Sequence, residues 1–305
     1  MLSIEHIQSI CKGDIHISEP LAPQTSFRIG GPVDIYIEPK STDELAALVR
    51  YFREVEARYI VLGNGSNILI SDEGIRGVAL NIERHFSSLS IDGPVITAGA
   101  GARLSAFVDF CIRNARGGSE MLAGIPGTLG GALIMNAGAY GGEISDYLLD
   151  VTVLRGSEVV SVDRERAGFR YRGSDLRNDI VLSARFHLPE GESEELRKRR
   201  KELLLKRNAA QPVQHPNAGS IFKNPEGGYA AKLIEECGLK GYRYGGAHVA
   251  ERHANFIINT GQATAADVLA VIRHVRRTVH ERTSILLELE IQLLGFSAEV
   301  LESLN

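Results

Sequence analysis

A serine, a lysine and an asparagine lie within the short stretch "PNAGSIFKNP" (Pro216–Pro225). A serine hydroxyl can act as a nucleophile, as a proton donor or as a hydrogen-bonding group in a turn. The hydrolase motif G-x-S-x-G does not fit, because Phe222 stands where its second glycine belongs. From residue types alone, Ser220 is therefore a proton donor or, as is more common, a structural residue of an Ala-Gly-Ser turn.

Two glycine-rich segments could bind an anion. "LGNGSN" (Leu62–Asn67) follows an expected strand, and "AGIPGTLGGALIMNAGAYGGE" (Ala123–Glu143) follows an expected helix. Glycine makes up 32 of 305 residues, or about 10%, against roughly 7% on average. Backbone N–H groups that no side chain covers form nests suited to a pyrophosphate. Such loops are also often simple turns, so both interpretations stay open at this point.

Other chemical signatures are missing from the chain. "GAGARL" (Gly99–Leu104) lacks the third glycine of the dinucleotide fingerprint, and neither a P-loop lysine nor His-Glu-x-x-His occurs. Cys11, Cys111 and Cys237 are odd in number and far apart, which fits neither a disulfide framework nor a paired zinc site. We therefore expect no metal, and a reducing cytoplasm as the location.

Composition indicates an ordinary globular protein, with 44% apolar and 24% charged residues. The net charge of -4 gives no polycation for nucleic acid. The start, "MLSIEHIQSICKG", has the spacing of a surface helix and not of a secretory signal. No apolar run reaches the roughly 20 residues that cross a bilayer, so we expect no membrane insertion.

Several elements must position these loops. A strand is expected over residues 33–39, a helix over 41–54 with a Ser41–Glu44 capping box, and further strands over 58–63, 68–71 and 77–81. Residues 149–162 have the pattern of a hairpin turning at "RGS". A basic helix near residues 193–207 is expected to present a solvated face, and contact of some of its cations with an anionic ligand is the alternative.

The last hundred residues form a region of their own. They predict a helix closed by Gly238, a strand over 255–260, a helix over 264–282 and a last strand over 285–295. We expect strands and helices packed in two layers there.

Six segments together resemble the UDP-N-acetylenolpyruvoylglucosamine reductase family: "TSFRIGGPVDIYIEP", "VLGNGSNILISDEGIRGVALN", "MLAGIPGTLGGALIMNAGAYGGEI", "FRYRGSDLR", "NAGSIFKNP" and "AAKLIEECGLKGYRYGGAHVAERHANFIINTG". They occur in the family's order between about Thr25 and Gly295. Either glycine loop alone would be a weak signal, whereas six blocks in order are highly specific.

The resemblance implies an α+β fold. A two-part FAD-binding module of the vanillyl-alcohol-oxidase (PCMH) type, residues 1–82 and 83–204, precedes an α/β substrate-binding domain, residues 205–305. It implies non-covalent FAD, NADPH as co-substrate, and reduction of UDP-N-acetylglucosamine-enolpyruvate to UDP-N-acetylmuramate in peptidoglycan synthesis. We also expect a monomer. The implied cofactor-binding residues are Gly63, Asn64, Gly65, Ser66, Asn67, Gly124, Ile125, Pro126, Gly127, Thr128, Gly130, Gly131, Asn136, Gly138 and Ala139.

This reaction defines three catalytic tasks. Hydride addition to the alkene leaves an enolate whose charge spreads onto the substrate carboxylate and requires preorganised donors. Arg172 matches the family's arginine and offers a planar fork for a carboxylate, and Glu290 matches the C-terminal glutamate, which helps only while protonated. Ser220 falls on the catalytic serine and is the expected donor of a proton to the α-carbon.

Four further residues are expected at the substrate: Lys223, Asn224, Lys240 and His253. The two lysines can equally be ordinary surface residues. The chain also departs from the family pattern, with Leu289 in place of a proline and Gln292 in place of an arginine. Glu288 is therefore an alternative to Glu290, since residues two apart on a strand face the same side.

The stretch of sequence between Arg172 and Pro189 is too short to contain the extra tyrosine-bearing loop of a longer subtype, so the shorter subtype is expected. Two other functions remain open: a flavin oxidase or dehydrogenase of another small molecule on the same fold, and a catalytically silent nucleotide-binding module. No histidine lies beside "GNGSN", which disfavours a covalently attached flavin.

Overall fold

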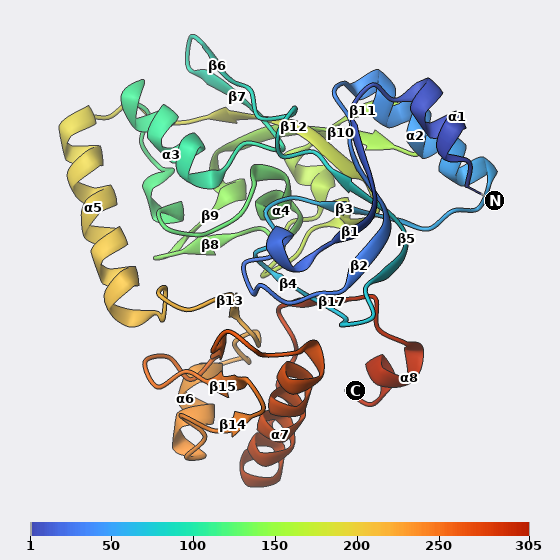
Figure 1. The fold of residues 1–305 in the computed structure, drawn as a ribbon. Coiled ribbons are helices and arrows are strands. Elements are labelled where there is room, and N and C mark those ends of the chain that lie inside the picture. Colours follow the sequence, from blue (N-terminus) through green and yellow to red (C-terminus); the bar gives the residue numbers. More distant parts are fainter. Residues whose placement is uncertain (1, 305) are drawn as a thin grey trace. The chain divides into compact units, whose positions relative to one another are not determined.

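The computed structural model describes residues 2–304, in which helices and strands are mixed along the chain (Figure 1). The α-helices are α1 (Ile4–Ile10), α2 (Thr42–Glu54), α3 (Leu104–Arg113), α4 (Leu129–Ile134), α5 (Ser193–Ala210), α6 (Ala230–Glu236), α7 (Ala265–Thr283) and α8 (Ala298–Glu302). Within this described part of the chain, no helix has both the length and the apolarity that crossing a membrane requires.

Among residues 2–304, the strands form five sheets. They are β1 (Asp14–Pro20), β2 (Pro32–Glu38), β3 (Tyr59–Leu62), β4 (Ile68–Ile70), β5 (Ile75–Asn81), β6 (Leu89–Asp92), β7 (Val95–Gly99), β8 (Gly138–Ala139), β9 (Gly142–Glu143), β10 (Leu148–Arg155), β11 (Glu158–Asp163), β12 (Ile180–His187), β13 (Asn217–Ser220), β14 (Arg243–Tyr244), β15 (Ala247–Val249), β16 (Phe256–Asn259) and β17 (Gln292–Leu294). Their orders are β1-β2-β5-β3, β11-β10-β12-β7-β6, β13-β16-β15-β14, β17-β4 and β8-β9.

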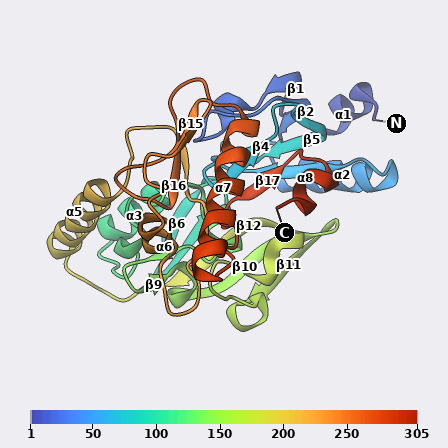
Figure 2. The same ribbon diagram turned by 90° about the horizontal axis from the view of Figure 1, so that it is seen from below.

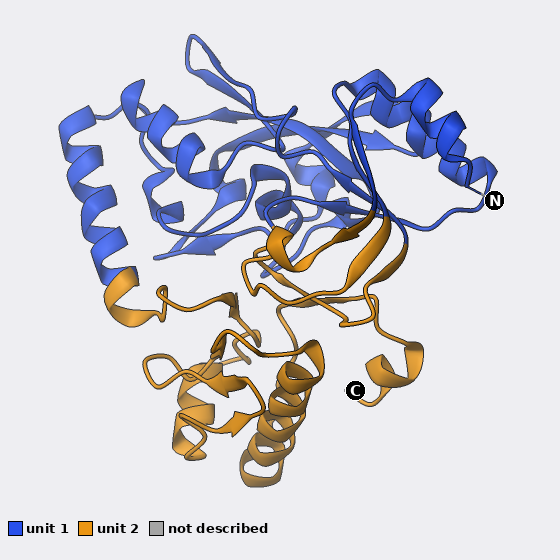
Figure 3. Ribbon diagram, viewed as in Figure 1, with its two compact units in different colours: residues 1–17, 35–64, 77–207 blue, residues 18–34, 65–76, 208–305 orange. Residues whose placement is uncertain are grey.

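The chain folds into two compact units that alternate along the sequence (Figure 3). The first unit contains residues 1–17, 35–64 and 77–207, and the second contains residues 18–34, 65–76 and 208–305. The boundary at residues 64 and 65 falls inside the first glycine loop. The division into domains 1–82, 83–204 and 205–305 stays a prediction.

In the first unit, a five-stranded antiparallel sheet carries the core. β10 and β11 pair from Asp150 with Asp163 to Arg155 with Glu158, which confirms the hairpin expected over residues 149–162. Its turn contains Gly156 at a φ of 65°, a left-handed conformation that glycine adopts without steric cost. Helix α4 packs against β7 and β12 and is thereby held on this sheet.

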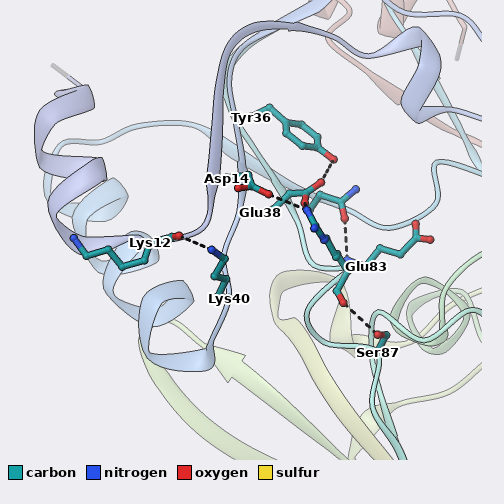
Figure 4. A network of polar contacts seen from close by, with 9 residues as sticks. Lys12, Asp14, Tyr36, Glu38, Lys40, Glu83 and Ser87 are labelled. Carbon is teal, nitrogen blue, oxygen red and sulfur yellow. Dashed lines mark hydrogen bonds and ion pairs between the residues drawn. The ribbon is translucent and has the colours of Figure 1, made fainter.

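The strand, the helix and the three further strands expected near the N-terminus are present as β2, α2, β3, β4 and β5. The Ser41 side chain accepts a hydrogen bond from the Glu44 N–H at 3.2 Å and begins α2 as the sequence predicts. Nearby, Figure 4 shows a polar network in which Tyr36 donates to Glu38 at 3.3 Å and the Lys40 ammonium donates to the Lys12 carbonyl at 2.9 Å. Tyr36 is buried, whereas the contact between Lys40 and Lys12 is exposed.

In the second unit, α7 packs against β14 and β15; Figure 2 labels α7 and β15. Thr264 and Asp267 form a capping box at the start of α7, as a helix beginning at residue 264 requires. The carboxylate of Asp72 accepts hydrogen bonds from the N–H groups of Ala265 and Ala266 at 2.8 and 3.1 Å. A residue from the segment after β4 thus caps a helix that begins almost 200 positions later.

Two local predictions are wrong. The strand expected over residues 285–295 is reduced to β17 and a single bridge between Leu289 and Phe222. One reason is that the Leu287 carbonyl accepts a hydrogen bond from the Arg276 side chain at 2.8 Å instead of joining a strand ladder. Ser220 ends strand β13 and pairs with Phe256 after an irregularity, with Gly219 at a φ of 78°, so the segment is a bulged strand and not a free turn.

Candidate active site

The first glycine loop starts where β3 ends, and Gly63 is in close contact with the second loop. A Cβ atom on Gly63 would lie 2.3 Å from the Oγ1 atom of Thr128, far inside van der Waals contact. Both residues belong to the first unit. Only glycine at position 63 therefore lets these two loops, 65 positions apart in the sequence, approach each other as they do.

The second glycine loop has a fixed backbone shape. Gly124 and Gly127 have φ values of 75° and 131°, which side chains rarely tolerate. Thr128 precedes α4, and the N–H groups of Leu129 and Gly130 donate to the carbonyls of Ala102 and Ala100, both at 2.8 Å. These hydrogen bonds anchor the loop, and they occupy the N–H groups of Leu129 and Gly130, which are therefore not available to a ligand.

Asn136 carries an unused acceptor beside this loop. It has a φ of 44°, and its Nδ2 donates to Glu143 Oε2 at 2.5 Å and to the Arg170 carbonyl at 3.2 Å. Its buried Oδ1 has no hydrogen-bond partner among residues 2–304. A buried amide oxygen left unpaired is costly, so this position fits a bound group that donates a hydrogen bond.

Arg172 lies at the tip of a tight turn in the first unit. Arg170 and Gly173 exchange backbone hydrogen bonds at 3.0 and 3.1 Å, which leaves Tyr171 and Arg172 as the turn residues. Arg172 has a φ of 54°, and its Nη2 donates to the Gly138 carbonyl at 3.4 Å. A left-handed arginine costs about 1–3 kcal/mol, and such strain is concentrated at functional sites.

Arg207 also lies beside the second glycine loop, although the sequence interpretation did not assign it individually to the site and left ligand contact by the basic helix as an alternative. It is half-buried near the end of α5, and its Cδ atom would be 2.8 Å from a Cβ on Gly124. Burial lowers the pKa of Arg207, Tyr140 acts to raise it, and the nearby charge of Arg172 lowers it further. The position in a run of seven basic residues concealed it, because such a run usually marks a solvated helix face.

The part of the first glycine loop that belongs to the second unit is equally constrained. Gly65 has a φ of 61°, and a Cβ there would lie 2.2 Å from the carbonyl oxygen of Gln24. The Gly65 carbonyl accepts a hydrogen bond from the Ser26 N–H at 3.1 Å. Asn67 continues the loop, with its carbonyl accepting from the Gln292 N–H at 2.9 Å and its Nδ2 donating to the Glu290 carbonyl at 3.2 Å.

Ser220 and Glu290 come together in the second unit. The N–H of Glu290 donates to the carbonyl of Ile221, the residue after the serine, at 2.8 Å. Asn67 holds the Glu290 carbonyl, so the backbone of Glu290 lies between the glycine loop and the serine segment. Ser220 and Glu290 are both half-buried.

Glu288 has different surroundings from Glu290. Its side chain is 74% exposed and forms an ion pair with the Lys223 ammonium at 3.2 Å. The Lys223 N–H donates to the Glu288 carbonyl at 2.9 Å. This segment is not a regular strand, so the expectation that Glu288 and Glu290 face the same side does not hold. The half-buried Glu290 is the better candidate for a catalytic carboxyl.

The other expected substrate residues also lie in the second unit, and each has a partner within the protein. Lys240 pairs with Glu235 at 2.7 Å, and the Asn224 Oδ1 accepts from the Ala230 N–H at 3.1 Å at the start of α6. The His253 ring packs edge-on against Phe256, with ring centroids 4.8 Å apart. Their contact with substrate stays a prediction.

Two family models match the chain. The model for the C-terminal domain of UDP-N-acetylenolpyruvoylglucosamine reductase matches residues 211–294, and that for an FAD binding domain matches residues 33–162. These matches confirm the expected order of an FAD-binding module followed by a C-terminal domain.

Relatives extend the similarity over nearly the whole chain. The UDP-N-acetylenolpyruvoylglucosamine reductase of Desulforamulus reducens is 43% identical over 292 residues, covering 95% of this chain and 96% of that protein. That of Lachnoclostridium phytofermentans is 45% identical over 285 residues, covering 91% and 92%. The crystal structure of the reductase from Thermus caldophilus matches with a TM-score of 0.80 and 37% identity, covering 93% of this chain and 99% of that one. The chain therefore belongs to the UDP-N-acetylenolpyruvoylglucosamine reductase family.

Proposed function

We propose that this chain reduces the enolpyruvyl ether of UDP-N-acetylglucosamine-enolpyruvate to UDP-N-acetylmuramate in peptidoglycan synthesis, with NADPH as co-substrate and non-covalent FAD as cofactor. The observation that supports the proposal most directly is the pair of hydrogen bonds formed by the backbone of Glu290. Its N–H is bonded to Ile221 beside Ser220, and its carbonyl is bonded to Asn67 of the glycine loop. Two of the three residues assigned to catalysis thereby lie next to a loop assigned to the cofactor.

The glycine loops fit FAD. Gly63 cannot carry a Cβ, Gly65 and Gly124 have left-handed backbones, and the buried Asn136 Oδ1 lacks a partner within residues 2–304. The residues that would hold the cofactor are those from Gly63 to Asn67, those from Gly124 to Gly131, and Asn136, Gly138 and Ala139. When bound, FAD supplies redox chemistry, taking a hydride from NADPH and delivering it to the alkene.

Arg172 and Glu290 would stabilise the charge that forms on the substrate. Hydride addition places negative charge on the enolate and its carboxylate, and the guanidinium of Arg172 can donate two parallel hydrogen bonds to that group. The Gly138 carbonyl and the tight turn hold Arg172 in place before the reaction, so little reorganisation is needed. Glu290 contributes only while its carboxyl is protonated, because only then can it donate a hydrogen bond.

Ser220 would place a proton on the α-carbon. An enolate carbon is strongly basic, so a neutral hydroxyl is sufficient when it is well positioned. Strand β13 fixes Ser220 through its pairing with Phe256, and the Ile221 N–H donates to the Asn255 carbonyl at 2.8 Å. These hydrogen bonds hold the backbone from which the Ser220 hydroxyl projects.

Ser220→Ala tests the assignment. Reduction of bound flavin by NADPH should keep its rate, whereas reoxidation by the enolpyruvyl substrate should slow by about 10²–10⁴-fold, the usual contribution of a proton donor. Stopped-flow absorbance of the flavin measures both half-reactions. Ser26→Ala is a suitable control, because its hydroxyl donates to the Asn217 carbonyl at 2.7 Å and has no assigned chemical role. Equal slowing of both half-reactions in Ser220→Ala would indicate a structural serine.

The remaining assignments belong to the same proposal. Lys223, Asn224, Lys240 and His253 would contact the sugar nucleotide, and the protein would act as a monomer in the cytoplasm. Size-exclusion chromatography with light scattering tests the oligomeric state, and a dimer peak would contradict a monomer.

A further inference from the structure

Arg207 differs from the other arginines of α5. Arg197 pairs with Glu194 at 2.6 Å, Arg199 with Glu120 at 3.3 Å and Arg200 with Asp109 at 3.0 Å. In the described part of the chain, the guanidinium of Arg207 has neither an ion pair nor a hydrogen bond, although the residue is half-buried. Its environment therefore differs from that of a solvated basic helix face.

Three parts of the first unit surround Arg207. Its stem lies against the second glycine loop, since a Cβ on Gly124 would be 2.8 Å from its Cδ and 3.6 Å from its Nε. Tyr140, whose hydroxyl donates to the Leu203 carbonyl of α5 at 3.1 Å, lies close enough to influence its charge. The third neighbour is Arg172, whose positive charge acts against the protonated form of Arg207.

This arrangement is unfavourable without an anion. A cation that loses water and faces a like charge is destabilised, and such cations in proteins are normally paired. The last turn of a helix does favour a cation through the helix dipole. That effect does not require burial, and Lys206 is exposed in the same turn.

We propose that Arg207 and Arg172 together form a two-guanidinium site for the carboxylate of the enolpyruvyl group. The inference rests on the proposed function and extends it by a second cation for the same group. A carboxylate has two oxygens and can accept hydrogen bonds from both guanidinium groups. The negative charge that grows on this group during reduction is then met by two fixed cations in place of one.

Two ligands separate a carboxylate site from a diphosphate site. UDP-N-acetylmuramate carries both groups, whereas UDP-N-acetylglucosamine carries the diphosphate alone. Isothermal titration of the FAD-loaded protein gives both dissociation constants for the wild type, Arg207→Gln and Arg207→Lys. Lys206→Gln is the matched control, because it removes one positive charge from the adjacent, exposed position of the same helix.

We expect Arg207→Gln to weaken the binding of UDP-N-acetylmuramate about 10- to 100-fold, which corresponds to the loss of one charged hydrogen bond. The dissociation constant of UDP-N-acetylglucosamine should not change. Arg207→Lys should restore part of the loss, and Lys206→Gln should change neither constant. Flavin absorbance and thermal unfolding identify a variant that has lost its fold or its cofactor.

An equal loss of affinity for both ligands would overturn the inference and would show that Arg207 binds the diphosphate. No change in either ligand would show that Arg207 binds no substrate anion, and selective loss of FAD would assign it to the cofactor phosphates. The proposed function fails separately, when the wild type does not oxidise NADPH in the presence of the enolpyruvyl substrate.

Discussion

The contact between Gly63 and Thr128 predicts a specific coupling between the two glycine loops. In Gly63→Ala the new Cβ would lie 2.3 Å from Oγ1 and 3.1 Å from Cγ2 of Thr128. Because Thr128 is only 4% exposed, its side chain has little room to move. Overpacking of this kind costs about 1–3 kcal/mol in the free energy of unfolding. To the extent that the two loops relax apart when FAD leaves, the same strain also weakens FAD binding, by at most roughly 150-fold.

Thr128→Ala should relieve most of this strain. It removes Oγ1 and Cγ2 and leaves only the Thr128 Cβ, 3.3 Å from the new methyl group, which is tight but requires a shift of a few tenths of an ångström. The double variant should therefore be more stable than the sum of the single variants predicts, with a coupling energy of about 1–2 kcal/mol.

Urea unfolding in excess FAD and fluorescence titration of FAD measure the two quantities. Gly131→Ala serves as a control for stability, because a Cβ there meets only Thr128 Oγ1, at 3.7 Å. Strictly additive effects of Gly63→Ala and Thr128→Ala would refute the reasoning, since they would show that the two loops do not meet at these atoms.

Two further predictions concern the second unit. Glu290→Gln should slow reduction of the enolpyruvyl substrate at least tenfold, whereas Glu288→Gln should stay within about twofold, because its exposed ion pair contributes little; the reverse order in steady-state assays would select Glu288. Asp267→Asn should cost up to about 1 kcal/mol at pH 7, because it removes the negative charge that accepts hydrogen bonds at the start of α7. Although burial acts to raise the pKa of Asp267, hydrogen bonds from the N–H groups of Thr264 and Gly246 bring it below 3.8. Because the pKa is lower in the folded state, the ionised Asp267 carboxyl stabilises the fold above pH 3.8. This stabilisation is lost as the pH falls through the folded-state pKa. The gap between wild type and Asp267→Asn in urea unfolding should therefore narrow below pH 3.8, and a constant gap would contradict this.

Local patterns predicted the elements that one stretch of chain can specify. The Ser41 cap and the hairpin with Gly156 each depend on residues within a few positions of one another. Such signals act through backbone geometry and nearby hydrogen bonds, so they are visible without the rest of the fold. The resemblance to a known family supplied the cofactor and the reaction, which patterning alone left open.

Local patterns could not predict which segments of the chain make up each of the two units. Residues 18–34 and 65–76 group with the C-terminal third of the chain. Strand β4 pairs there with β17, and Phe27 and Leu69 lie in the core of that unit. Hydrogen bonds add to this, from Asn259 to the Phe27 carbonyl at 3.0 Å and from the Ala265 N–H to Asp72 at 2.8 Å. Asparagine and aspartate occur in many turns and caps, so their types do not reveal partners 232 and 193 positions away.

The same limit explains why Arg207 was not assigned individually to the site, whereas Lys223 and Lys240 were selected. All three are cations in polar segments, but only the structure separates them: Glu288 and Glu235 pair with the two lysines. These pairs do not oppose a role in substrate binding, because partly exposed ion pairs are worth under about 1 kcal/mol and a diphosphate with more charge can replace the carboxylate. Because each lysine must give up its ion pair with a glutamate to bind the diphosphate, its net contribution to the binding free energy is smaller. Arg207 has no competing carboxylate among residues 2–304, so its interaction with an anion should contribute in full to affinity.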